Sequence, residues 1–125
     1  MVTRRDFGRA RKLRRKNQFD DVLRHASVRV GRGPLRLAAC DNDLETPRLG
    51  LIVGKRMLPL AVDRNRAKRV IRESFRQADG LPAMDVVVRV ALPGAKVSLV
   101  DANRLFGAFA QIVEKRNERE MGREG

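Results

Sequence analysis

The sequence predicts a single-domain α+β sandwich, in which helices pack on one small sheet. Three observations predict this class. Apolar residues recur at helical spacing in three segments, short apolar runs typical of strands lie between them, and clusters of Gly, Pro and Asp separate the runs. The chain has 125 residues, of which 42% are hydrophobic, and this is enough for one core. The predicted order is α-β-β-β-α-β-α, with the first strand near residues 28–32.

The first helix is expected to follow Asn17, whose side chain suits an N-cap. Its apolar face consists of Phe19, Val22, Leu23 and Ala26. A turn containing Gly33 and Pro34 leads to a strand at 35–40 and a polar loop at 41–47. The next apolar strand, 48–55, is continuous enough to be central in a sheet.

A second helix is expected to start at Asp63 and to end before Gly80 and Pro82. The valine-rich run at 85–92 predicts a strand. Ser98 and Asp101 have the spacing of a helix cap, and a third amphipathic helix follows them. Its apolar positions are Leu99, Ala102, Leu105, Phe106, Phe109, Ile112 and Val113.

The charge of the chain points to a polyanionic partner. It carries 28 Lys and Arg against 15 Asp and Glu, a net charge of +13. Release of cations from phosphates makes nucleic acid the first choice of partner. An anionic membrane is the rival, but no apolar run is long enough to span one, and the basic segments lack the apolar face of an interfacial helix.

We divide the chain into a basic arm at 1–16, a domain at 17–116 and a tail at 117–125 that is expected to fray. The arm is almost free of acids, which favours phosphate contact over the alternative of a solubilising tail. An Arg-rich transit peptide is disfavoured because the arm has few serines and no clear apolar face.

Candidates for catalysis are few. His25 is the only histidine and Cys40 the only cysteine, so the chain offers neither a disulfide nor a Cys/His zinc site. Acidic residues at 41–45 could hold hydrated magnesium, although a solvated loop is the more common explanation. We therefore expect no catalytic and no metal-binding residue in the protein, and a self-contained nuclease is disfavoured.

The densest cationic cluster lies between residues 55 and 76. On a helical wheel its apolar residues gather on one side and its polar residues on the other. Arg64 and Arg66 would stand at the positive end of the helix dipole, where they cost stability unless an anion lies nearby. Charge alone does not separate DNA from RNA, but no zinc finger or leucine zipper is present.

The segments "RLGLIVGKR" (48–56) and "RNRAKRVIRESFR" (64–76) resemble the protein component of bacterial ribonuclease P. That family carries an R-N-R-x-K-R signature on a helix that follows a strand and a basic pair. The segments "FDDVLRHA" (19–26) and "LPAMDVVVRV" (81–90) also resemble it, and the likeness covers about residues 12–113.

The resemblance implies a sandwich like that of a ribosomal protein domain, with a left-handed βαβ crossover. It implies an RNA-binding subunit of the endoribonuclease that removes the 5′ leader from precursor tRNA. A reducing, cytoplasmic location is expected, and the single cysteine is compatible with it. The partners would be the catalytic RNA and precursor tRNA, with no DNA or membrane partner. Magnesium would be bound mainly by the RNA and the substrate, and catalysis would belong to the RNA. A structural RNA-binding protein, such as a small ribosomal protein, is the alternative.

Site residues follow from the resemblance position by position. The RNA-binding set would be Lys55, Arg56, Arg64, Asn65, Arg66, Lys68, Arg69, Arg72 and Arg76. The cleft for the leader would be lined by Phe19, Leu23 and Leu37. Leu23 and Leu37 stand where many relatives have an aromatic residue, so apolar packing would replace base stacking there. The loop at 57–62 is less basic than in some relatives, which weakens it as an RNA contact.

Overall fold

The computed structural model describes residues 12–13 and 15–124 and contains four strands and three helices. The elements are α1 (Lys16–His25), β1 (Val28–Arg32), β2 (Leu35–Asp41), β3 (Arg48–Ile52), α2 (Ala61–Gln77), β4 (Met84–Val90) and α3 (Leu99–Glu124). The predicted α+β class and element order are confirmed, including the strand near residues 28–32. Most of the predicted basic arm, residues 1–11, lies outside the described residues.

The four strands form one mixed sheet in the order β1-β2-β4-β3. β2 pairs antiparallel with β1 and with β4, whereas β3 pairs parallel with β4 at the edge of the sheet. α2 connects these two parallel strands and thus forms the expected βαβ crossover. Because β3 and β4 are parallel, the loops that follow them emerge at the same end of the sheet.

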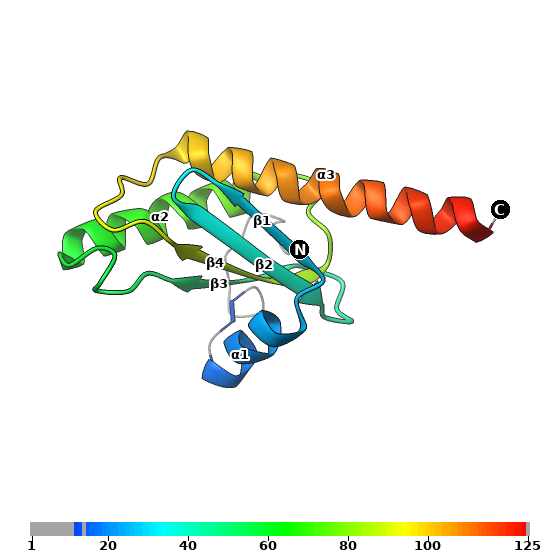
Figure 1. Ribbon diagram of the computed structural model, residues 1–125, viewed down its shortest axis with the longest axis horizontal. Helices are drawn as coiled ribbons and strands as arrows, with labels where there is room; N and C mark the ends of the chain where they lie inside the picture. The colour runs from blue at the N-terminus through cyan, green and yellow to red at the C-terminus, as the bar shows by residue number, and fades with distance from the viewer. Residues whose placement is uncertain (1–11, 14, 125) are drawn as a thin grey trace, which may run out of the picture.

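Helices cover the two faces of the sheet unequally (Figure 1). α2 and α3 pack on one face, where their phenylalanines meet the valines of β4 and the leucines of β2 in the main core. Phe75 and Phe106 pack edge to face there, with ring centroids 5.6 Å apart. α1 alone packs on the other face, over β2 and β4, around Val22, Ala38 and Val87.

Several boundaries differ from the predicted ones. α1 begins at Lys16 because Gln18 Oε1 accepts a hydrogen bond from the backbone of Arg15, which stands at the N-cap. Leu13 is buried and its amide donates to the carbonyl of Leu49 at 3.0 Å, so the fold begins before residue 17. α3 begins at the predicted cap, where the Asp101 amide donates to Ser98 Oγ at 3.1 Å.

α3 also continues beyond residue 116, where we ended the domain. It runs to Glu124 and projects past the sheet (Figure 1). Arg116 anchors its second half, because its guanidinium donates to Ser27 Oγ at 3.2 Å and lies 3.7 Å from the carboxylate of Asp41. No helix in the described part of the chain is both long enough and apolar enough to cross a membrane.

Candidate RNA interface

α2 presents a row of polar and basic side chains on the side opposite its buried face. The buried face consists of Ala67, Ile71, Ser74 and Phe75. The outer row, which we call the α2 ridge, consists of Asn65, Lys68, Arg69, Arg72 and Arg76. The ridge therefore has the orientation that the wheel predicted: one face of α2 docks on the fold and the other is open to a partner.

The ridge borders a hollow of about 520 Å³. Its lining residues are Asn65, Arg69, Arg72, Glu73 and Arg76. Glu73 is an acid within this basic surface, and it forms an ion pair with Arg76 and accepts a hydrogen bond from Gln77. No carboxylate of the described residues pairs with Arg69 or Arg72. These two guanidinium groups are therefore available to phosphate.

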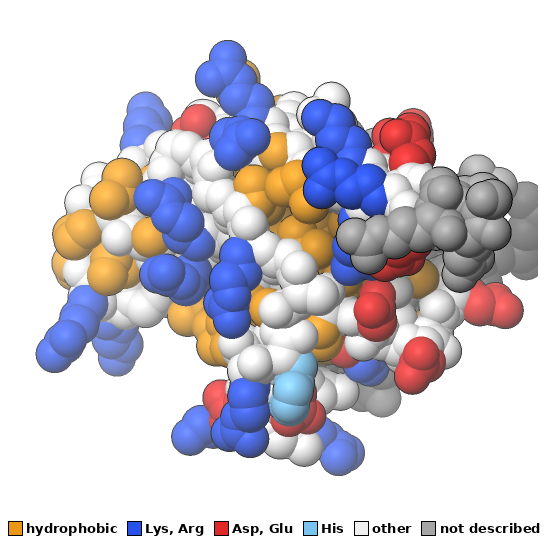
Figure 2. Space-filling view, turned by 45° about the vertical axis from the view of Figure 1, so that its right-hand side comes forward, with side chains coloured by type: hydrophobic (Ala, Val, Ile, Leu, Met, Phe, Trp, Pro, Cys, Tyr) orange, Lys and Arg blue, Asp and Glu red, His pale blue; other side chains and the backbone are white. Residues whose placement is uncertain are grey.

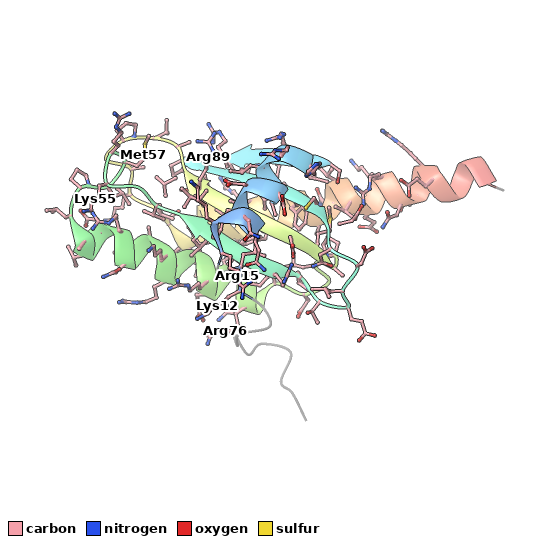
Figure 3. The ribbon with its side chains drawn as sticks, turned by 90° about the horizontal axis from the view of Figure 1, so that it is seen from below. Lys12, Arg15, Lys55, Met57, Arg76 and Arg89 are labelled. Atoms are coloured by element: carbon pink, nitrogen blue, oxygen red, sulfur yellow. The ribbon has the colours of Figure 1, made fainter. Side chains whose placement is uncertain are left out.

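The other basic residues of the signature occupy different positions. Lys55 and Arg56 lie in a turn after β3, which ends at Ile52 instead of residue 55. Figure 3 shows Lys55 at the N-terminal end of α2. Arg66 is exposed one turn into α2.

Arg64 is the exception within the signature. It lies seven residues before the buried Ile71 and hence on the same side of the helix. Its Nη1 donates to the carbonyl oxygens of Leu58 at 2.9 Å and Pro59 at 2.8 Å. α2 starts at Ala61, so Asp63 is inside the first turn instead of being the cap. Carbonyl oxygens of the fold therefore offset the charge of Arg64 at the helix start, where the sequence predicted that a nearby anion would do so.

A groove joins the ridge to α1 across the edge strand β3. It has a volume of about 400 Å³ and is lined by Lys12, Leu13, Phe19, Leu49, Leu51, Lys68 and Arg72. The ring of Phe19 lies directly over Gly50, where an added Cβ would approach Phe19 Cε1 to 2.6 Å. Figure 3 shows Lys12 near the C-terminal half of α2. Phe19 and two cations of the ridge therefore face one continuous groove.

A second hollow, of about 330 Å³, lies on the other side of α1. Its lining residues are Leu23, Arg29, Val30, Gly31, Arg36, Leu37, Ala38, Val87 and Arg89. Arg29 and Arg36 are held there by backbone carbonyl oxygens, since Arg29 donates to Leu23 at 2.8 Å and Arg36 donates to Gly33 at 2.8 Å. Figure 2 shows Lys and Arg side chains over much of one face of the molecule, with most of the Asp and Glu side chains on its right-hand side and lower edge.

The three residues predicted to line one cleft, Phe19, Leu23 and Leu37, do not all border one hollow. Phe19 and Leu23 lie in two hollows that α1 separates. Leu37 borders the second hollow, but its side chain is only 2% exposed and belongs to the core on the opposite face. Side chains of a strand alternate between faces, so Arg36 and Ala38, not Leu37, point to the side of α1.

Sequence reasoning missed three basic residues of these surfaces: Arg29, Arg36 and Arg89. Lys12, which lines the groove, belongs to the basic arm for which phosphate contact was predicted. A period-two signal was present, because each of the three arginines neighbours apolar strand residues that face the core. Assigning them to one surface required the pairing register, which places Arg36 opposite Arg89 on neighbouring strands.

The catalytic and metal candidates do not gather into a site. His25 is exposed at the end of α1, and its Nδ1 donates to the carbonyl oxygen of Asp21 at 3.2 Å. The acidic loop is ordered by Asn42, which accepts from the amide of Leu44 and donates to Asp85. Among residues 12–13 and 15–124 no three His, Cys, Asp or Glu side chains lie so that they could hold a metal ion.

Comparison with known proteins assigns the chain to a family. A family model described as Ribonuclease P matches residues 7–117. The chain belongs to the ribonuclease P protein family. It is 44% identical over 107 residues to the ribonuclease P protein component of Halorhodospira halophila, covering 85% of each chain. It is 46% identical over 104 residues to that of Azotobacter vinelandii, covering 82% of this chain and 80% of the relative.

Solved structures of the ribonuclease P family have the same fold. The RNase P protein of Staphylococcus aureus matches with a TM-score of 0.70 and 23% identity, over 84% of this chain and 96% of that one. The protein of Thermotoga maritima, solved in complex with 1-(4-fluorophenyl)-2-thiourea, matches with a TM-score of 0.57 and 29% identity, over 62% and 73% of the two chains. The predicted family and fold are thereby confirmed.

Proposed function

We propose that this chain is the RNA-binding protein subunit of ribonuclease P and promotes removal of the 5′ leader from precursor tRNA. The observation that carries the proposal is the α2 ridge, on which the family signature presents Arg69 and Arg72 without a carboxylate partner among the described residues. A ridge of this kind holds the phosphates of the catalytic RNA through guanidinium forks. Membership of the ribonuclease P family disfavours the alternative of a structural ribosomal protein.

The groove between α2 and α1 is the proposed place for the leader. The groove is open toward the α2 ridge, so the catalytic RNA bound on α2 and the leader lying over β3 would be adjacent. Lys12, Lys68 and Arg72 supply cations, and Phe19 supplies one aromatic face for an unpaired base. The second hollow, with Arg36 and Arg89, would continue this path on the other side of α1.

The protein's part in the reaction is to bind and align. Magnesium, held mainly by the RNA and the substrate, would activate the attacking water. The basic groove would lower the repulsion between the leader and the catalytic RNA, because its cations lie between the two backbones. We therefore assign positioning to the ridge and groove, and no bond-breaking step to a side chain of the protein.

Reconstitution tests the proposal. A bacterial ribonuclease P RNA is mixed with precursor tRNA at low magnesium, with and without the protein, and the released 5′ leader is measured. We expect the protein to raise the cleavage rate, and the protein alone to leave the precursor intact. Arg69→Ala/Arg72→Ala should remove most of the stimulation, whereas Arg104→Ala, an exposed cation of α3, should not. No stimulation by the unaltered protein would reject the proposal.

A further inference from the structure

One end of the molecule carries most of the large hydrophobic side chains that are exposed in the described part of the chain. Seven such side chains are exposed among the described residues. Five of the seven form what we call the apolar end: Leu60, Val62, Leu92, Leu99 and Val100. Val62 is 69% exposed and Leu60 is 62% exposed. Exposed hydrophobic side chains that lie together in this way indicate a binding surface.

The topology explains why these residues converge. The parallel strands β3 and β4 end at the same side of the sheet, so the β3–α2 and β4–α3 loops lie together there. The amide of Gly94 donates to the carbonyl of Met57 at 2.7 Å and joins the two loops. Figure 1 shows the N-termini of α2 and α3 at this end.

The core does not require these side chains. Leu58 and Val97, from the same two loops, are 4% and 1% exposed and anchor the loops in the main core. Their neighbours Leu60 and Leu99 point outward instead. Leu60 is the N-cap of α2, where Ser, Thr, Asp or Asn would satisfy an amide that leucine leaves open. An apolar residue at this position costs helix stability, which favours a role outside the fold.

The positive charge around the apolar end indicates the kind of partner that it binds. Lys55, Arg56 and Lys96 are exposed in the same two loops, and two helix N-termini add partial positive charge. Asp63 and Asp101, in the first turns of α2 and α3, offset only part of this charge. A second copy of the chain would bring another +13 to the contact. A polyanion that also offers apolar faces fits better, and unpaired nucleotides have both properties.

The apolar end is also continuous with the α2 ridge. Val62, Arg66 and Arg69 stand at i, i+4 and i+7, so they form one stripe along α2. An RNA that follows the ridge toward the start of α2 therefore reaches Val62 and Leu60 next. No aromatic residue belongs to the apolar end, so contact would be by aliphatic packing on base and sugar faces.

We propose that the apolar end packs against unpaired nucleotides of the catalytic RNA and extends the interface beyond the phosphate contacts of the ridge. This inference rests on the proposed function. The ridge supplies affinity that depends on salt, because each phosphate contact releases cations. The apolar end supplies affinity that does not depend on salt and limits how α2 can slide along the RNA backbone.

The two contributions can be separated by a salt titration. The complete protein is bound to a bacterial ribonuclease P RNA, and Kd is measured at several KCl concentrations. Leu60→Ser/Val62→Ser should raise Kd about tenfold at every concentration and leave the slope of log K against log salt unchanged. Serine is a good N-cap residue, so this variant should keep α2 folded. Leu44→Ser and Ile112→Ser, exposed elsewhere, are the matched controls and should bind like the unaltered protein.

The outcomes distinguish this inference from the proposed function. Unchanged affinity of Leu60→Ser/Val62→Ser, together with a smaller salt slope for Arg69→Ala/Arg72→Ala, would reject the apolar contact and leave the proposed function standing. No effect of either pair, with no stimulation of cleavage, would reject both. Sedimentation of the protein without RNA tests whether the apolar end binds a second copy of the chain instead. Self-association that Leu60→Ser/Val62→Ser abolishes, without loss of RNA affinity, would assign the apolar end to a second copy and overturn the inference.

Discussion

Arg64 is bound to the loop that precedes its own helix: its Nη1 donates to the carbonyl oxygen of Leu58 at 2.9 Å. The same nitrogen also donates to the carbonyl oxygen of Pro59 at 2.8 Å. Leu58 is buried, so the two bonds fix the β3–α2 loop to the first turn of α2. The guanidinium thus donates to two loop carbonyl groups that are outside the strands and helices. These bonds offset the unfavourable position of its charge near the positive end of the helix dipole.

Arg64 and Arg66 should therefore behave differently when each is changed to alanine. Arg64→Ala removes two hydrogen bonds from a charged donor and should lower the free energy of unfolding by about 1–2 kcal/mol. Arg66→Ala should leave it within about 0.5 kcal/mol, because Arg66 is exposed, and should weaken RNA binding instead. Urea unfolding and RNA titration measure the two effects. Equal stability of the two variants would contradict the structural role of Arg64.

The sequence could predict which segments form strands and helices, because these depend on local periodicity. It could also predict the cationic face of α2, since one wheel defines it. It could not predict which face of a strand a residue takes when both faces are apolar. Leu35, Leu37 and Ala39 face the core, while Ala38 faces α1. Arg36 is the one polar residue that marks the alternation, and the small apolar residues at 38–40 do not continue it. The cleft residues were carried over from the resemblance, which did not show that Leu37 faces the core and Arg36 the side of α1.

The role of Arg64 was also beyond the sequence. Its carbonyl partners belong to a loop whose path depends on Leu58 entering the core. Helix starts differ for a related reason: α2 begins two residues before Asp63 because the loop geometry brings Leu60 to the N-cap. Local sequence signals identify a helix better than they identify its first residue.

Gly50→Ala should displace the ring of Phe19. The new Cβ would lie 2.6 Å from Phe19 Cε1 and 3.1 Å from Leu13 Cβ, both closer than van der Waals contact. We expect a loss of about 1–3 kcal/mol in the free energy of unfolding and weaker binding of the leader. Gly54→Ala is the matched control, because a Cβ there meets no atom within 4 Å. Much of the loss should vanish in a Phe19→Ala background; a loss that persists there would show that the ring is not the obstacle.

Asp85→Ala should be among the most destabilising substitutions on the α1 face. Asp85 is 8% exposed and accepts two hydrogen bonds from Arg48, both at 2.7 Å, and one from Asn42 at 3.0 Å. Its removal leaves a half-buried guanidinium without a counter-ion, so we expect a loss of about 2–3 kcal/mol in urea unfolding.

The ion pair of Glu73 and Arg76 provides the comparison for Asp85. Both of its side chains are more than one third exposed, so Glu73→Ala should cost less than about 1 kcal/mol. A cost for Asp85→Ala as small as that for Glu73→Ala would mean that the pair with Arg48 adds little to the fold.

Cys40 should react slowly with thiol reagents in the folded protein. Partial burial raises the pKa of its thiol, and the carboxylates of Asp85, Asp41 and Asp21 raise it further, against a smaller opposing effect of Arg48. The thiolate is the reactive form, so a raised pKa leaves less of it at any pH below the pKa. The rate of reaction with a disulfide reagent, followed from pH 7 to 10, should rise at higher pH than for the urea-unfolded chain. Asp41→Asn removes one of the three negative charges and should move the profile back toward lower pH. A folded protein that reacts as fast as the unfolded chain at pH 8 would contradict the assignment, because burial and the carboxylates both act against the thiolate.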